Sequence, residues 1–336
     1  MIREYLRRVQ TTMADVYFAN LRARSHHESR SQKIRRLFEA AGFDEVVRPD
    51  DLAAVKLHVG ERGCDTYIHP VFARQVVDKI KERGAHPFIT DTGTLYAGSR
   101  ADAVRHTVTA IEHGFDYAVV GAPVIIADGL RGDHWSEVAI NGKHFGSVRI
   151  AGDILAAESM IVLSHVKGHD LAGFGGAIKN LAMGCAPPSG KAEQHAGRPF
   201  VEVERCGGCG KCTMVCPQAA MTVVEGRARL NPEHCVGCGD CMRSCPTEAI
   251  EFDWTTEIRP FLERLCEYAL GASLISPDGW ATSTSSSASP PTATASPGAT
   301  LQSSPISGSS PPPIRSLSTA RASISSTARG GLLKQR

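Results

Sequence analysis

Residues 53–91 read AAVKLHVGERGCDTYIHPVFARQVVDKIKERGAHPFITD. The stretch begins with an apolar, strand-like run at residues 53–59. A helical pattern follows at residues 69–83, which Gly84 ends, and an apolar run returns at residues 87–91. A strand, a helix and a second strand in this order are typical of a βαβ unit, whose two strands pair in parallel. This stretch therefore indicates an α/β fold.

The same alternation continues on both sides of this unit. Further helices are expected at residues 32–41 and 102–113 and from about Ala177, and further strands at residues 15–19, 117–120 and 160–165. Met13 is the expected start of the folded chain, and the α/β domain is expected over residues 13–198. The prediction is a mainly parallel sheet with flanking helices, whose sites lie in loops at the carboxyl ends of strands.

Composition argues against several classes of function. The chain has 336 residues, of which 42% are hydrophobic, so it can build more than one domain core. Its net charge is +2, and Lys and Arg form no dense stripe with interleaved aromatics, so no nucleic-acid partner is expected. The sequence has neither a run of about 18 to 20 apolar residues nor a secretory leader pattern. We therefore expect no membrane span and a cytoplasmic location.

Eight of the eleven cysteines fall in two identical runs of the form C-x2-C-x2-C-x3-C-P. The first run consists of Cys206, Cys209, Cys212 and Cys216, and the second of Cys235, Cys238, Cys241 and Cys245. This spacing is typical of bacterial ferredoxins with two 4Fe-4S clusters, in which the fourth cysteine of each run binds the other cluster. We therefore expect Cys245 to complete the first set of three and Cys216 to complete the second. Glycines within the runs allow positive φ angles and keep side chains away from the clusters.

These runs predict a small α+β module that resembles bacterial ferredoxins and spans residues 199–255. The alternative is a pair of zinc sites, although zinc sites rarely combine this three-cysteine ladder with Cys-Pro. Two clusters in series favour an electron-transfer protein with a redox partner protein, in a reducing compartment, over a purely structural role. Cys64, Cys185 and Cys266 receive no role.

A second candidate site lies in residues 164–180, which read SHVKGHDLAGFGGAIKN. Consecutive glycine amides before a helix can bind an anion, and a nearby lysine would add charge. The predicted cofactor-binding residues are therefore Gly173, Gly175, Gly176 and Lys167, with a small anionic substrate. The loop matches neither a P-loop nor a dinucleotide fingerprint. The alternative is an ordinary turn.

Basic residues around this loop suggest a substrate pocket. The candidate catalytic residues are His169, Lys179 and His195. Residues 91–94, DTGT, also follow a strand and are expected to form the opposite wall.

The 164–180 segment, the following LAMGCAP and KAEQH, and the two cysteine runs together resemble the iron-sulfur proteins grouped as domain of unknown function 362. The resemblance covers about residues 14–270. It implies an α/β domain with a ferredoxin module, found mostly in anaerobes and archaea, without a settled reaction.

A fainter resemblance is to the nickel-pincer lactate racemases. In that family a His, a Lys ten residues on and a His sixteen residues further serve the cofactor and the proton or hydride transfer, and His169, Lys179 and His195 have this spacing. The racemases also have a histidine directly after Gly-Thr, where this chain has Leu95. The sequence thus leaves three hypotheses: a ferredoxin-linked oxidoreductase, an electron carrier without its own substrate, and a racemase-like isomerase.

The C-terminal part changes character. Residues 256–270 are expected to form a helix that returns to the α/β domain, and residues 271–336, rich in Ser, Thr, Pro and Ala, to form a disordered tail. With permitted synonymous codons, a shift of reading frame turns the chain from Pro277 into a well-patterned globular sequence that begins GRMGYFNFLIG. We therefore hypothesise a one-base frameshift near residues 274–277.

Overall fold

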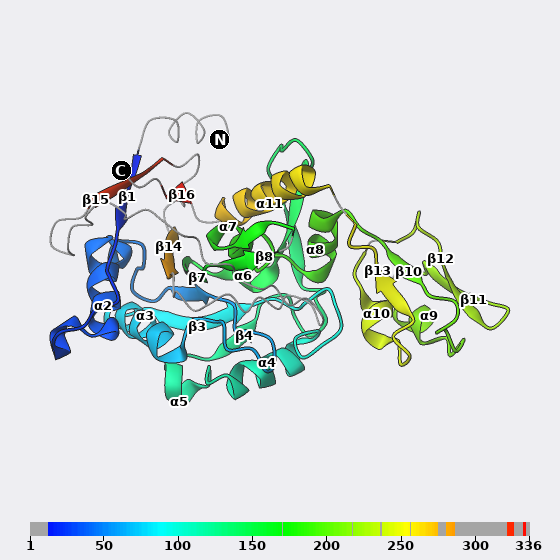
Figure 1. The fold of residues 1–336 in the computed structure, drawn as a ribbon, viewed down its shortest axis with the longest axis horizontal. Helices are drawn as coiled ribbons and strands as arrows, with labels where there is room; N and C mark the ends of the chain where they lie inside the picture. Colours follow the sequence, from blue (N-terminus) through cyan, green and yellow to red (C-terminus); the bar gives the residue numbers. More distant parts are fainter. Residues whose placement is uncertain are drawn as a thin grey trace, which may run out of the picture.

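The computed structural model describes residues 13–169, 171–216, 218–235, 237–255, 257–274, 280–285, 321–325 and 332–333. Its main sheet has five strands, in the order β14-β7-β2-β3-β4, and every neighbouring pair is parallel (Figure 1). In chain order these strands are β2 (Leu52–Lys56), β3 (His86–Asp91), β4 (Val124–Ile126), β7 (Ser159–His165) and β14 (Trp280–Ser285). The predicted α/β fold with a parallel sheet and flanking helices is confirmed.

Helices flank the sheet on both faces (Figure 1). They are α2 (Arg30–Ala40), α3 (Pro70–Glu82), α4 (Ala103–Glu112), α5 (Tyr117–Val120), α6 (Gly152–Ala156), α7 (Ala177–Ala182), α8 (Pro188–His195) and α11 (Ile258–Ser273), with the 3-10 turns η1 (His26–Glu28) and η2 (Phe43–Glu45). Two antiparallel hairpins accompany them, formed by β5 (Trp135–Ala139) with β6 (Ser147–Ala151) and by β8 (Lys167–His169) with β9 (Gly173–Gly175).

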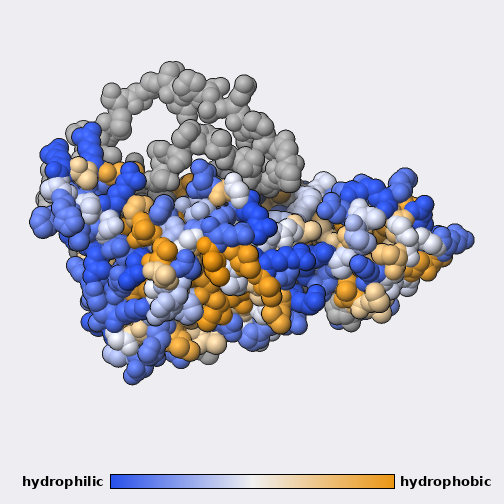
Figure 2. Space-filling model, turned by 90° about the horizontal axis from the view of Figure 1, so that it is seen from below, coloured by the Kyte–Doolittle hydropathy of each residue, from blue (hydrophilic) through white to orange (hydrophobic). Residues whose placement is uncertain are grey.

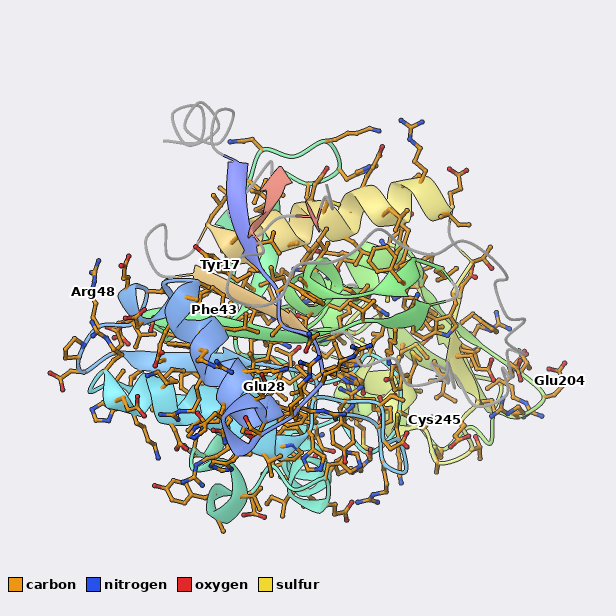
Figure 3. All side chains as sticks on the ribbon, turned by 60° about the vertical axis from the view of Figure 1, so that its left-hand side comes forward. Tyr17, Glu28, Phe43, Arg48, Glu204 and Cys245 are labelled. Carbon is orange, nitrogen blue, oxygen red and sulfur yellow. The ribbon has the colours of Figure 1, made fainter. Side chains whose placement is uncertain are left out.

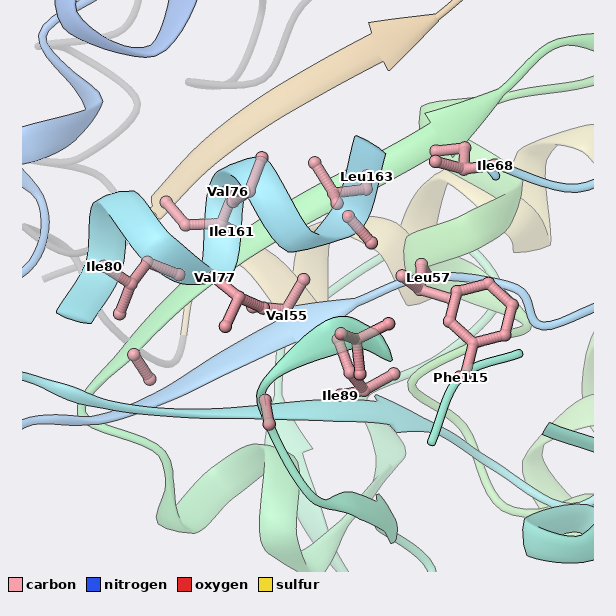
Figure 4. Packing of buried hydrophobic residues seen from close by; sticks show 14 of the residues in the cluster. Val55, Leu57, Ile68, Val76, Val77, Ile80, Ile89, Phe115, Ile161 and Leu163 are labelled. Carbon is pink, nitrogen blue, oxygen red and sulfur yellow. The ribbon is translucent and has the colours of Figure 1, made fainter. Parts of the chain in front are cut away.

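The central strands are buried on both faces because successive side chains of a strand point in opposite directions. Val55 of β2 and Ile161 of β7 belong to a first core, whereas the preceding residues, Ala54 and Met160, belong to a second. Figure 4 shows the first core, in which α3 covers the sheet. Its contributors from this helix include Ala73, Val76, Val77 and Ile80. The alternation explains why the strands read as continuous apolar runs rather than as half-polar ones.

Helix α3 follows from local sequence signals. Pro70 occupies the first helical turn, where its missing N–H costs nothing. The buried residues recur every three to four positions, which places them on one side of the helix. The helix ends before Gly84, whose φ of 81° lies in the left-handed region. This part of the chain can therefore be predicted from the sequence.

The strand predicted at residues 117–120 is wrong, because this segment is the short helix α5. The side chain of Asp116 accepts a hydrogen bond from the backbone N–H of Val119 at 3.1 Å and so caps the helix. Gly121, with a φ of 75°, ends it. The strand of the sheet follows as β4, which pairs with β3. Four apolar residues are too few to distinguish a strand from a buried helical turn.

The cysteine-rich segment forms a lobe at one end of the molecule (Figure 1). It contains β10 (Pro199–Val201), α9 (Lys211–Val215), β11 (Met221–Val224), β12 (Arg227–Leu230), α10 (Asp240–Ser244) and β13 (Ile250–Phe252). Strand β10 pairs antiparallel with β13, and β11 with β12. The chain then returns through α11, which places Phe261, Leu265 and Tyr268 in the second core. We refer to residues 199–252 as the cysteine module.

Most of the tail expected at residues 271–336 lies outside the described residues, as does most of the segment affected by the frameshift hypothesis. Helix α11 continues to Ser273, three residues beyond the expected end at 270. Residues 280–285, expected to be disordered, instead form β14, which pairs in parallel with β7. This pairing satisfies backbone groups of β7 that an uncovered edge would leave exposed. Strand β1 (Met13–Tyr17) pairs antiparallel with β15 (Arg321–Ser325), which in turn pairs with β16 (Leu332–Leu333).

Helix α4 has an apolar stripe that faces solvent. Val104, Val108 and Ile111 are 63%, 42% and 49% exposed. Leu130, whose carbonyl accepts a hydrogen bond of 3.1 Å from the N–H of Ala103, is 67% exposed. The three helical residues lie three or four positions apart, so they share one side of the helix. Figure 2 shows apolar residues gathered on this underside of the molecule. The stripe lies on the opposite side of α4 from Ala110, which belongs to the first core.

Candidate functional site

Charged and polar side chains gather at the carboxyl ends of the parallel strands. Lys56 is the last residue of β2, Asp91 of β3 and His165 of β7. Asp128 follows β4 by two residues. Because parallel strands end at the same edge of a sheet, residues far apart in the sequence meet here. We call this region the carboxyl edge.

A fully buried ion pair lies at its centre. The Nζ atom of Lys56 lies 3.0 Å from Oδ1 of Asp91, and the two residues are 0% and 4% exposed. The same Nζ donates a hydrogen bond of 2.7 Å to Oδ1 of Asn180. Asn180 in turn donates to the carbonyl of Leu163 at 3.0 Å and to Oγ of Ser164 at 2.9 Å. The network therefore ties β2, β3, β7 and α7 together.

Arg100 extends this network toward solvent. Its Nη1 lies 3.4 Å from Oδ2 of Asp91, and its Nε donates to Oε1 of Glu61 at 3.0 Å. The hydroxyl of Tyr96 also donates to Glu61. Burial by itself would raise the pKa of Asp91, but the cations around it, Lys56 foremost, lower that pKa overall. The carboxylate of Asp91 is thus held in its charged form.

Two groups at the edge titrate near neutral pH. Burial raises the pKa of Asp128 to about 6 and lowers that of Lys191 to about 8. Asp128 accepts hydrogen bonds of 3.0 Å from the backbone N–H of Gly93, and Nζ of Lys191 donates to Oγ1 of Thr92 at 2.6 Å. Groups with such pKa values are suited to accept or donate protons. Residues 91–94 therefore lie at the carboxyl edge, where Lys191 of α8 contacts them, while their role as a pocket wall stays a prediction.

The three predicted catalytic residues lie close together. Burial, with smaller contributions from the nearby charges of Lys179 and His169, lowers the pKa of His195 to about 3. The ring of His195 stacks on Phe261 with centroids 5.0 Å apart and meets Trp254 edge-on at 4.9 Å. The structure thus brings together residues from β8, α7 and α8, while their roles stay predictions.

The predicted glycine loop forms the hairpin of β8 and β9 and the start of α7. Gly173 has a φ of 71°, which favours glycine at this turn. A Cβ atom on Gly175 would lie 3.4 Å from Cδ of Lys179 and 4.0 Å from Cγ of Lys167. The loop therefore runs between the two predicted lysines. Gly176 precedes α7, a helix of only six residues.

The carboxyl edge also contains residues that the sequence did not single out, namely Lys56, His58, Arg100 and Asp128. His58 follows β2, and its ring centroid lies 5.6 Å from that of His165. A sequence signal for two of these residues exists, because a lysine and a histidine interrupt the apolar run of residues 53–59. Buried ionisable residues need partners, so such an interruption marks a site or a buried ion pair. Arg100 gives no comparable signal.

Buried His106 should make stability depend on pH. Burial lowers its pKa from 6.5 to about 3, so its contribution is fully present above pH 6.5 and is lost as the pH falls below that value. Between pH 7 and pH 5 we expect this histidine to reduce the free energy of unfolding by about 2 kcal/mol. Urea unfolding at both pH values should show that His106→Leu loses about 2 kcal/mol less of its free energy of unfolding between pH 7 and pH 5 than the original protein does.

His86 provides the control, because its side chain is 67% exposed. His86→Leu should keep the pH dependence of the original protein. If His106→Leu kept the pH dependence of the original protein, His106 would not be the source of that dependence.

The two halves of the cysteine module have the same local backbone. Gly208 and Gly237 have φ angles of 65° and 70°, and Gly210 and Gly239 have 74° and 77°. In each half a five-residue helix follows the second glycine. In each half also a backbone N–H four residues after the last cysteine donates to its sulfur, from Ala220 to Cys216 at 3.1 Å and from Ala249 to Cys245 at 3.3 Å. The repeated motif therefore folds twice in the same way.

One cavity of the module is lined by cysteines of both runs. These are Cys216, Cys235, Cys238 and Cys241. Burial, with smaller contributions from the other three cysteines, raises the pKa of the Cys241 thiol to about 12. Cys216 thus lines one cavity with three cysteines of the second run. That these four cysteines bind one cluster stays a prediction.

The other predicted set consists of Cys206, Cys209, Cys212 and Cys245, of which Cys209 is exposed. Burial raises the pKa of Cys212, with contributions from Cys206 and Cys209. Cys245 lines a cleft between the module and residues such as Glu61 of the α/β domain. Among the described residues, no three His, Cys, Asp or Glu side chains converge closely enough to hold one metal ion. Cluster binding is therefore treated below as a proposal.

The crossed cysteine set lies directly against the α/β domain. Leu95 and Ala192 are 2% and 1% exposed and share a hydrophobic cluster with Cys241. A Cβ atom on Gly239 would lie only 3.0 Å from the carbonyl oxygen of Leu95. Arg243 donates to the carbonyl of Thr94 at 3.5 Å. Residues 91–95 thus connect the carboxyl edge with the contact surface of the cysteine module.

In the side-chain view, Cys245 and Glu204 of the cysteine module lie to the right of Tyr17 and Arg48 (Figure 3). The long apolar helix that a membrane crossing requires is not found in the part of the chain that the structure describes.

Fold and site together define a protein with a parallel α/β domain, a polar carboxyl edge and an attached cysteine module. The chain belongs to the family described as "Domain of unknown function (DUF362)", whose sequence model matches residues 53–286. Comparison with curated proteins finds no significant match.

A similar solved structure is the lactate racemase apoprotein from Thermoanaerobacterium thermosaccharolyticum. It has 12% sequence identity and a TM-score of 0.33, and the match covers 74% of this chain and 46% of that chain. This chain therefore spans about half the length of the racemase.

Proposed function

We propose that the protein is an iron-sulfur electron-transfer protein that exchanges electrons between two 4Fe-4S clusters and a substrate pocket at the carboxyl edge. The observation that carries the proposal is the cavity lined by Cys216 together with Cys235, Cys238 and Cys241. A crossed set of this kind is what two-cluster ferredoxins require.

The residues of the module fit such clusters in two further respects. Backbone N–H groups already donate to the sulfurs of Cys206, Cys216 and Cys245 at 3.1–3.3 Å. Hydrogen bonds of this kind tune the reduction potential of an iron-sulfur cluster. Gly237 and Gly239 also line the cavity, and their positive φ angles and close approach to Ala192 and Leu95 leave no room for a side chain. When bound, the clusters would supply one-electron chemistry.

The contact with the α/β domain favours a pocket that uses these electrons over a free-standing carrier. Leu95 packs in the same cluster as Cys241, and three residues before it Thr92 accepts a hydrogen bond from Lys191. Lys191 and Asp128 are suited to proton transfer at the same edge. Reduction of many organic substrates requires both electrons and protons, so the proximity is chemically useful.

The crossed ligand set can be tested by removing single cysteines from anaerobically purified, reconstituted protein. Cys216→Ala and Cys238→Ala should abolish the same one of two reducible iron signals and lower the iron content from about eight to about four per chain. Cys245→Ala should abolish the other signal. Cys266→Ala is the control, because this exposed cysteine lies on α11 outside the module. Zinc bound in preference to iron would overturn the proposal.

A racemase-like isomerase is the second candidate, because His169 and Lys179 lie close to His195. The same preparation distinguishes the two functions. Nickel or an organic cofactor that is retained after removal of iron, and lost in Lys179→Ala, would favour the isomerase. Reducible clusters without such a cofactor would favour electron transfer.

A further inference from the structure

Two histidine rings at the carboxyl edge have buried nitrogen atoms without partners. Nδ1 of His58 and Nε2 of His165 make no hydrogen bond within the described residues. Their ring centroids lie 5.6 Å apart, at the ends of the adjacent strands β2 and β7. An unsatisfied buried polar group is costly, and its persistence calls for a ligand or another explanation.

Lys167 lies beside these rings. It is the first residue of β8, half-buried, and its charge acts on both His58 and His165. Burial lowers its pKa, and in the part of the chain that the structure describes its ammonium group makes no hydrogen bond or ion pair. A partly desolvated ammonium group without a partner attracts an anion more strongly than an exposed one does.

The groups that the structure shows acting on the charge of His58 are all basic. Besides burial, its pKa is lowered by Arg100, Lys167, His165 and Lys56. The two acidic groups nearby are already engaged, since Asp91 pairs with Lys56 and Glu61 with Arg100. The ammonium group of Lys167 and the two ring nitrogens are therefore available to bind a ligand.

We infer that His58, His165 and Lys167 bind an oxyanion, namely the carboxylate or phosphoryl group of a small molecule. Two neutral imidazoles can each donate one N–H, and the lysine donates a charge-assisted hydrogen bond, so the site matches a group with two or more oxygen acceptors. The inference deepens the proposed function by naming the substrate class, and it rests on that function only for what happens to the substrate afterwards.

Anion binding can be measured with the full-length protein. Acetate and inorganic phosphate serve as separate probes, followed by calorimetry and by NMR of ¹⁵N-labelled imidazole groups. The ring signals of His58 and His165 should move on addition of at least one anion, whereas those of exposed His86 should not. The anion that binds more tightly identifies the group as carboxylate or phosphoryl. No movement with either anion would overturn the inference.

Lys167→Met tests the role of the ammonium group. It should raise the dissociation constant of the anion about tenfold or more. Lys143→Met removes the same charge from an exposed ion pair with Glu263 and should leave the affinity unchanged. Thermal unfolding of each variant shows whether it is folded, and His165→Gln offers a second variant that keeps a polar group. Equal affinity in Lys167→Met and Lys143→Met would refute the site.

Measurement of reducible iron in the same samples separates this inference from the proposed function. Intact cluster signals without anion binding would defeat only the oxyanion site. Anion binding without reducible iron would support the site and defeat electron transfer.

Discussion

Asp91→Asn is expected to lower the free energy of unfolding by about 3–5 kcal/mol. The carboxylate of Asp91 neutralises Lys56, which is 0% exposed, and also contacts Arg100. Removal of one member of a buried ion pair leaves an uncompensated charge in a poorly solvated place. Urea unfolding at pH 7, monitored by circular dichroism, measures the loss.

Asp78→Asn is the matched control. Asp78 pairs with Arg74 on the surface of α3, at an Nε–Oδ1 distance of 2.7 Å. A surface pair of this kind contributes about 0.3–0.5 kcal/mol. Adding Lys56→Met to Asp91→Asn should recover part of the loss, since it removes the unpaired charge. If Asp91→Asn and Asp78→Asn lowered the free energy of unfolding by similar amounts, the buried pair would contribute no more to stability than the surface pair.

Gly208→Ala is expected to disrupt the first half of the cysteine module. The φ angle of Gly208 is 65°, and a Cβ atom there would lie 2.2 Å from the carbonyl oxygen of Gly226. The left-handed backbone costs an L-residue about 1–2 kcal/mol, and the overlap adds about 1–3 kcal/mol. Iron content after anaerobic reconstitution and the thermal unfolding temperature should both fall.

Gly207→Ala provides a control one residue away. A Cβ atom on Gly207 would meet nothing within 4 Å, and its φ angle is not positive. This variant should retain its iron and its stability. Should both variants bind iron equally, the loop must be able to shift without cost, and the argument from close packing at Gly208 would fail.

The α/β fold could be predicted because its main signals are local. The apolar runs of β2 and β7 and the spaced apolar residues of α3 each specify one element, and their alternation implies parallel pairing. The error at residues 117–120 has a local cause too. The capping carboxylate of Asp116 and the left-handed Gly121 favour a helical turn over a strand, and a pattern based on hydrophobicity alone misses both.

The candidate sites differ in how much the sequence reveals. Cys216 and Cys241 line one cavity, and the repeat spacing predicts this grouping because it is typical of ferredoxins in which the fourth cysteine crosses over. The pair of Lys56 with Asp91 and the approach of His58 to His165 depend on which strands are neighbours in the sheet. Such contacts follow from strand order, which composition and periodicity do not determine.

The position of α11 in the chain has a consequence for how the protein is made. This helix covers the second core with Phe261, Leu265 and Tyr268, yet it is synthesised after the entire cysteine module. During translation the module can therefore assemble while the second core still lacks its α11 residues, although earlier residues such as Ile150, Ile154 and Leu181 already pack there. The second core is therefore completed only by a segment from beyond the module.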